Sequence, residues 1–158
     1  MRIREIEEKD NLKMEQIIKS SLESFELNIP GTAYFDPQLG SLSHYYDPQP
    51  QAKYWVAVNE WDEAIGGAGI APFGQTGRIC ELQKLYIAPE AQGKGLSKEL
   101  MNTTLGFAKE HFTHCYLETF EKLRTANRLY VKFGFRQLDR ALDETEHSAC
   151  DTWYIKEL

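Results

Sequence analysis

The stretch that most constrains the fold is "LYIAPEAQGKGLSKELM", residues 85–101, in which an apolar strand pattern runs through two glycines into a helix-forming sequence. Glycine beside a helix costs conformational entropy on folding. Gly93 and Gly95 therefore suggest that the backbone there must stay free of side chains. The first N–H groups of a helix lack intrahelical acceptors, and the helix dipole places partial positive charge beside them. Lys94 and Lys98 add local charge. We therefore expect a strand-turn-helix unit that binds a pyrophosphate.

The composition is that of an ordinary soluble globular protein and predicts a single domain over residues 1–158. The chain is 42% hydrophobic and 27% charged, and no linker-like tract divides it. No apolar run is long enough to cross a bilayer, and the charged N-terminus does not resemble a secretory signal. Three scattered cysteines and four histidines without metal spacing predict neither disulfides nor a metal site, and we expect the histidines at the solvated surface. A cytoplasmic protein with reduced thiols is expected.

The net charge of −6 bears on the class of partner. Nucleic-acid binding needs a concentrated basic face to neutralise phosphates, and the sequence shows none. An acidic surface suits a cationic partner instead.

Hydrophobic periodicity predicts a mixed α/β fold with helices over the faces of one sheet. A helix is expected from Asp10 or Asn11, with Ile18, Leu22 and Phe25 on one face. The glycines of "IGGAGIA" indicate a bulge or a close backbone approach. Further helices are expected over residues 95–112 and 123–133, a long loop with one short helix over 30–51, and strands over 2–7, 53–60, 65–71, 77–88, 114–120, 135–139 and 151–158.

Two familiar phosphate-binding motifs do not fit the glycine turn. A P-loop needs Ser or Thr after Gly-Lys, and a dinucleotide fingerprint needs a small residue where Lys98 stands. What remains is Gln-x-x-Gly-x-small, formed by Gln92, Gly95 and Ser97. This pattern resembles the coenzyme A signature of the GNAT superfamily of N-acetyltransferases. Upstream "ELQKLYIAPEAQGKG" resembles the family's fourth strand, and downstream "ANRLYVKFGF" resembles its fourth helix.

The resemblance implies a central, mostly antiparallel sheet of about seven strands with about four helices, in which the fourth and fifth strands splay apart. It implies acetyl-CoA as the co-substrate, with the Ile87 N–H polarising the thioester carbonyl. The coenzyme contacts that it implies are Leu85, Tyr86, Ile87, Gln92, Gly93, Lys94, Gly95, Leu96 and Ser97. Many members carry Asn where this chain has Leu123, so either a side-chain contact to the pantetheine arm is missing or Asn127, one turn further on, substitutes in part.

Acetyl transfer to an amine needs a base, because an alkylammonium has a pKa near 10.4. Glu81 is the first candidate, since strand alternation would place it on the same face as Gln83, Leu85 and Ile87. Glu118, a charge within an apolar strand, is the rival base. Either carboxylate would also attract a cationic amine.

Tyr130 matches the tyrosine that the family directs toward the coenzyme sulfur, and the resemblance implies that it is the catalytic acid. Tyr34 and Tyr45, in the proline-rich loop, would line the acceptor pocket, although packing over the sheet is an equal alternative.

The leading hypothesis is an acetyl-CoA-dependent N-acetyltransferase in which the acceptor attacks directly in a ternary complex. The acceptor would be a small cationic amine such as a polyamine, or a peptide amine. A catalytically silent acyl-CoA-binding sensor and a nucleotide-phosphate enzyme are the alternatives. The family often pairs through strands or helices, so a homodimer is also considered.

Overall fold

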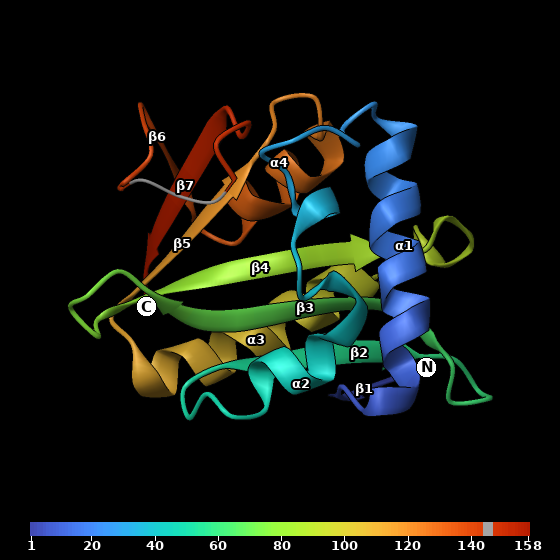
Figure 1. Ribbon diagram of the computed structural model, residues 1–158. Coiled ribbons are helices and arrows are strands. Elements are labelled where there is room, and N and C mark those ends of the chain that lie inside the picture. The colour runs from blue at the N-terminus through green and yellow to red at the C-terminus, as the bar shows by residue number, and fades with distance from the viewer. Residues whose placement is uncertain (144–146) are drawn as a thin grey trace.

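Seven strands form one sheet in the order β1-β2-β3-β4-β5-β7-β6 (Figure 1). The computed structural model describes residues 1–143 and 147–158. Within these residues the strands are β1 (Arg2–Glu5), β2 (Lys53–Val58), β3 (Ala64–Phe73), β4 (Ile79–Ile87), β5 (His114–Thr119), β6 (Arg136–Leu138) and β7 (Thr152–Glu157). The α-helices are α1 (Asn11–Ser24), α2 (Leu42–Tyr46), α3 (Leu96–His111) and α4 (Arg124–Lys132). The mixed α/β fold expected from the sequence is confirmed.

Helices cover both faces of this sheet. In Figure 1, α1 and α2 lie in front of the strands and α3 lies behind them. The front core contains Met14, Ile18 and Leu22 of α1, and the rear core contains Met101 of α3 and Tyr130 of α4. None of the helices in the described part of the chain is both long and apolar enough to cross a membrane.

The expectation that Phe25 shares the buried face of α1 is wrong. The helix ends at Ser24, and Glu26 takes a left-handed backbone with φ 59°. The chain therefore leaves the helical path, and Phe25 is 43% exposed.

The sheet opens between β4 and β5. Every neighbouring pair of strands is antiparallel except these two, whose parallel register covers only Ile79–His114, Cys80–Cys115 and Glu81–Tyr116. From Leu82 to Ile87, β4 has no registered partner in β5. The expected splay is therefore present, and it begins beside Glu81.

A bulge in β4 follows that opening. Gly69 pairs with Gln83 and Gly67 with Tyr86, so Ala68 faces two residues, Lys84 and Leu85. Lys84 takes φ 51°, a left-handed conformation that is uncommon outside glycine. The extra residue reverses the strand's alternation.

Because of this reversal, the expectation that Glu81 shares one face with Gln83, Leu85 and Ile87 is only partly right. Gln83 bonds to both Glu81 and Tyr46 on the front face. Leu85 and Ile87 pack into the rear core. Glu81 and Gln83 therefore share a face, but Leu85 and Ile87 lie on the other.

The glycines of β3 make room for an aromatic ring that supports the bulge. A Cβ on Gly67 would lie 2.5 Å from Tyr54 Cε1, and one on Gly69 would lie 2.7 Å from Tyr54 Cδ2. The Tyr54 hydroxyl donates to the Lys84 carbonyl at 2.7 Å. Of the two features that the sequence suggested for these glycines, the close approach is present, whereas the bulge beside Gly67 and Gly69 lies in β4.

We expect Gly67→Ala to lower the free energy of unfolding by about 1–3 kcal/mol, because the methyl group would overlap the fixed Tyr54 ring. Gly106→Ala, in α3 with no heavy atom within 4 Å of the added Cβ, should instead raise it by about 0.4–1 kcal/mol. Urea denaturation of both variants measures the contrast. Equal effects would show that contact with Tyr54 does not decide the result.

Candidate functional site

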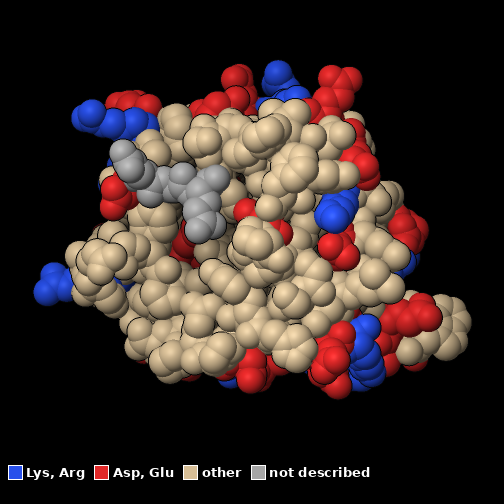
Figure 2. All heavy atoms as spheres, in the orientation of Figure 1, with Lys and Arg blue, Asp and Glu red and all other residues tan. Residues whose placement is uncertain are grey.

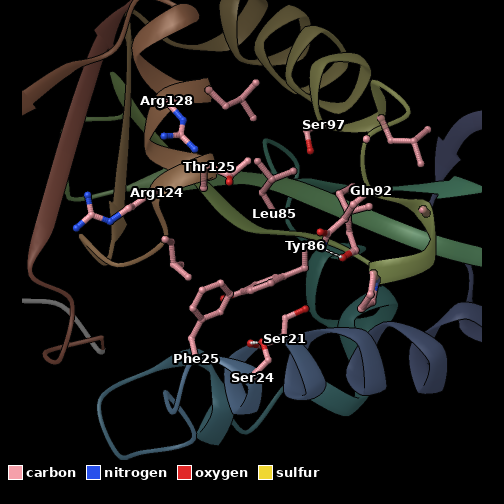
Figure 3. Close-up of a pocket in the computed structure, with 18 of the residues that line it drawn as sticks. Ser21, Ser24, Phe25, Leu85, Tyr86, Gln92, Ser97, Arg124, Thr125 and Arg128 are labelled. Carbon is pink, nitrogen blue, oxygen red and sulfur yellow. Dashed lines mark hydrogen bonds between the residues drawn. The ribbon is translucent and has the colours of Figure 1, made fainter.

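A cavity of about 590 Å³ lies where four elements meet. Its wall comes from the end of α1, the end of β4, the turn and first residues of α3, and α4 with the loop before it. In Figure 3, Leu85 and Tyr86 lie in the middle of this space, with Ser21 and Ser24 on one side and Ser97 on the other.

The glycine turn presents bare backbone to this cavity. Gly93 and Gly95 have φ 78° and 81°, and no heavy atom lies within 4 Å of a Cβ built on either. The first helical hydrogen bond of α3 runs from the Glu99 N–H to the Gly95 carbonyl, at 3.2 Å. The amides of the first turn of α3 are therefore left for another acceptor, and an anion suits them.

Cations surround the same cavity. Five of its lining residues are Lys or Arg and none is Asp or Glu: Lys98, Lys122, Arg124, Arg128 and Lys132. None of the ion pairs formed within the described residues involves any of the five. In Figure 3, Arg128 lies between α4 and Ser97, whereas Arg124 points away from Ser97. The charge of this wall suits a ligand with several phosphates.

Most of the predicted coenzyme contacts line the cavity. They are Leu85, Tyr86, Ile87, Gln92, Gly93, Gly95, Leu96 and Ser97. Gln92 also donates from Nε2 to the Ile87 carbonyl at 3.1 Å, which fastens the turn to the end of β4. Lys94 is not among the lining residues.

Asn127 has a different environment from the one expected. It does not line the cavity, and its Nδ2 donates to the carbonyls of Phe120, Glu121 and Leu123 at 2.9–3.2 Å. Its side-chain amide thus holds the loop before α4, while Leu123 itself lies on the cavity wall.

Glu81 lies where β4 and β5 part, on the face opposite the rear core. Its Oε1 accepts a hydrogen bond from Gln83 Nε2 at 2.7 Å. Burial raises the pKa of this carboxyl, and the charge of Glu118 adds to the rise, while Gln83, His147 and Lys84 oppose it. A carboxyl with a raised pKa can accept and release a proton nearer to neutral pH.

Tyr130 is buried beside Phe135 and Tyr154, with ring centroids 6.0 and 5.8 Å away. Burial raises the pKa of its hydroxyl, so the phenol keeps its proton at neutral pH. Tyr130 does not line the cavity, whereas Tyr86 does. Burial raises the pKa of the Tyr86 hydroxyl, and neighbouring Tyr130 adds to the rise.

The other predicted acceptor residues are spread over the front face. Glu118 on β5 accepts a hydrogen bond from the Tyr116 hydroxyl at 2.9 Å. The Tyr34 hydroxyl donates to Glu23 at 3.2 Å, and Tyr45 lines a separate cavity of about 290 Å³. Tyr34 and Glu81 line neither of these two cavities.

Sequence reasoning missed the cations of α4. Arg124, Arg128 and Lys132 recur every four residues, which places them along one side of a helix. That spacing was a usable signal, although only the fold shows that this side meets the glycine turn. Among the described residues, no group of His, Cys, Asp and Glu side chains could hold a metal ion.

Comparison with known proteins gives consistent matches. The Acetyltransferase (GNAT) family model matches residues 14–135. The uncharacterised N-acetyltransferase YjgM of Escherichia coli (strain K12) is 40% identical over 152 residues, covering 94% of this chain and 90% of YjgM. A GNAT-family acetyltransferase structure from Staphylococcus aureus Mu50 superposes with TM-score 0.85 at 20% identity, over 99% of this chain and 98% of that one.

A third match carries a bound ligand. A phosphinothricin acetyltransferase from Sinorhizobium meliloti, solved in complex with AcCoA, superposes with TM-score 0.75 at 21% identity, over 99% of this chain and 88% of that one.

We expect Gly95→Ala to lower the free energy of unfolding by about 1–2 kcal/mol, because an L side chain is strained at this left-handed position even where space is open. Gly95→Asn should cost less, since Asn tolerates the same conformation better. Thermal melting of the two variants measures the difference. An equal loss for Ala and Asn would contradict the backbone explanation.

Proposed function

The chain belongs to the GNAT acetyltransferase family, and from this premise we propose that it transfers the acetyl group of acetyl-CoA to a primary amine of a small cationic molecule or a peptide. The observation that carries the proposal is the cavity, whose wall contains bare α3 amides and five cations and no carboxylate. Acetyl-CoA supplies the thioester and brings the three phosphates that such a wall would hold.

The proposed reaction is direct attack in a ternary complex. The C–N bond forms at the thioester carbonyl as the C–S bond breaks, the amine loses a proton, and the sulfur gains one. The backbone N–H of Ile87 is the proposed donor to the charge that develops on the carbonyl oxygen.

Glu81 is the proposed acceptor of the amine proton. The cavity residue Leu85 is four positions along the strand from Glu81, at most about 13 Å when fully extended, so we propose transfer through water. Its raised pKa supports this role, and the front-face position supports an acceptor that enters from the side opposite the coenzyme.

Tyr130 is the proposed donor to the departing sulfur. Its retained proton and its closeness to Tyr86 support this role. Because the Tyr130 ring packs in the rear core, the sulfur would have to reach the opening between β4 and β5 to meet it.

The paired carboxylates support a cationic acceptor. Burial and, to a smaller extent, the charge of Glu118 raise the pKa of Glu81, so the two carboxyls hold one negative charge more readily than two. The ionised member would attract an ammonium group, and the amine could then lose its proton to the base after binding. A polyamine-like small molecule fits this charge pattern best.

We expect Glu81→Gln to lower kcat/KM by about 10²- to 10³-fold, because the amine would remain protonated. The dissociation constant for coenzyme A should stay within about twofold. Thiol release from acetyl-CoA, with spermidine, L-lysine and an alanine-initiated peptide as acceptors, measures the rate. The acid limb of the pH profile should lie above the ordinary range of Glu, since activity rises only as Glu81 loses its proton.

Glu118→Gln is the matched comparison for this prediction. A larger loss in Glu118→Gln than in Glu81→Gln would transfer the role of base to Glu118.

Tyr130→Phe should lower kcat by about tenfold with little change in coenzyme binding.

Coenzyme binding should depend on the α4 cations. We expect Arg128→Gln to weaken binding of coenzyme A by about five- to tenfold, through loss of a charge-assisted contact to phosphate. Arg136→Gln, an exposed arginine on β6 outside the cavity, should leave it unchanged. Isothermal titration at two salt concentrations measures both, and equal affinities in the two variants would remove α4 from the binding site.

A further inference from the structure

Three segments that are distant in the sequence meet at one ionic cluster on the front face. Asp36 follows the 3-10 turn Ala33–Phe35, Lys84 is the bulge residue of β4, and His147 lies in the connection between β6 and β7. Lys84 Nζ lies 2.8 Å from Asp36 Oδ2, and His147 Nε2 lies 2.9 Å from the same oxygen. The mechanism proposed above uses none of the three.

The cluster is largely removed from solvent. The side chains of Lys84 and Asp36 are 4% and 6% exposed, and that of His147 is 24% exposed. The expectation that His147 is a solvated surface residue is therefore wrong. A buried carboxylate is stable only when it is paired with a cation. The contacts of Lys84 and His147 with Asp36 therefore hold the three segments together.

Backbone contacts draw the same segments together. The Ala149 N–H donates to the Gly31 carbonyl at 3.0 Å. A Cβ on Gly31 would lie 2.9 Å from the Ala149 nitrogen and 2.9 Å from Ser148 Oγ. The segment before Asp36 and the segment after His147 are thus packed against each other, and Lys84 ties both to β4.

The location of the cluster gives it a functional meaning. Lys84 stands between Glu81, the proposed base, and Leu85, which lines the coenzyme cavity. Figure 2 shows this face, where most charged side chains stand at the periphery and some acidic atoms lie within a central recess. The charge of Glu81 acts on His147 and Cys150, so the segment 147–150, with Asp36 bonded to it, lies near the proposed base.

We propose that Asp36, Lys84 and His147 form a clasp that positions the two acceptor-side segments beside Glu81. This inference rests on the proposed function. The clasp residues are positioning residues: they hold the walls that meet the acceptor, and they leave the coenzyme cavity unchanged because none of them lines it.

The strength of the clasp depends on pH in a defined direction. Asp36, Lys84 and Glu81 face the His147 imidazole, and Cys150 and Glu118 lie beside them. Burial lowers the pKa of His147, but the hydrogen bond and charge of Asp36 outweigh burial and raise it. Burial likewise opposes ionisation of Asp36, but His147 and Lys84 outweigh it and lower the pKa of that carboxyl.

The raised pKa of His147 and the lowered pKa of Asp36 determine how the stability of the clasp depends on pH. The His147 contribution is complete below the ordinary histidine pKa of about 6.5 and is lost as pH rises through the raised value. The Asp36 contribution is present above the ordinary Asp value and is lost only as pH falls through the lowered one. Near-neutral and alkaline pH therefore weakens the clasp through His147 alone.

The test compares His147→Gln, His147→Lys and the unsubstituted protein, each checked for folding by circular dichroism. The acceptor is whichever of spermidine, L-lysine or an alanine-initiated peptide gives the highest kcat/KM. At about pH 6.5 we expect His147→Gln to raise the acceptor KM about tenfold while the dissociation constant for coenzyme A stays within about twofold. Asp36→Asn should act in the same direction.

His147→Lys keeps its charge at alkaline pH, so the ratio of its acceptor KM to that of the unsubstituted protein should fall between about pH 6.5 and pH 9. That ratio cancels the titration of the amine itself. His44→Gln, an exposed histidine 3.6 Å from Glu8, is the matched control and should change nothing.

Two results would overturn the clasp while leaving the acetyltransferase function intact. One is an unchanged acceptor KM in folded His147→Gln and Asp36→Asn, and the other is a parallel loss of coenzyme affinity, which would indicate general loosening of the fold. No turnover by the unsubstituted protein, with coenzyme A bound, would instead overturn the proposed function and the clasp together.

Discussion

The bulge at Lys84 is the constraint on which the arrangement of the site depends. It places two residues of β4 opposite Ala68 and reverses which side chains face the rear core. Glycines at positions 67 and 69 admit the Tyr54 ring, whose hydroxyl holds the Lys84 carbonyl. Without the extra residue, Leu85 would lie on the same face as Glu81, and coenzyme and acceptor sides would not be separated. A local irregularity of one strand thus organises both halves of the site.

The proposed coenzyme side and the proposed acceptor side carry opposite charge. On the coenzyme side, bare amides at the start of α3 and five cations face a cavity without carboxylates. On the acceptor side, Glu81 and Glu118 lie near the parting of β4 and β5, within reach of each other's field. Under the proposed function, a polyanionic coenzyme and a cationic amine would therefore enter from separate sides with complementary charge. The parted strands are where the reacting groups would meet, because pairing between β4 and β5 ends at Glu81.

Sequence patterns predicted the parts of the site whose chemistry is local. The positive φ of Gly93 and Gly95 and the bare turn follow from glycines before a helix, and the succession of strands and helices along the chain follows from periodicity. The predicted face of Leu85 was wrong, because strand alternation cannot reveal an extra residue. The residue that adopts φ 51° here is a lysine, so no glycine marked the bulge. His147 and Asp36 lie more than a hundred residues apart, so only tertiary packing brings them together. Asn127 stays a predicted coenzyme contact, and the pattern could not show that its amide nitrogen donates to three backbone carbonyls of the preceding loop.

The net charge of −6 says little about either ligand, because charges beyond about 8 Å are screened at physiological salt. The cations around the cavity decide the field there, whatever the total. On the acceptor side, Lys84 neutralises Asp36, so the local balance is set by Glu81, Glu118 and the protonation of His147. When His147 loses its proton, that side becomes more negative while its clasp weakens. Attraction of a cationic amine and alignment of that amine would then change in opposite directions with pH, which is why alignment has to be measured as a ratio between variants that differ only at His147.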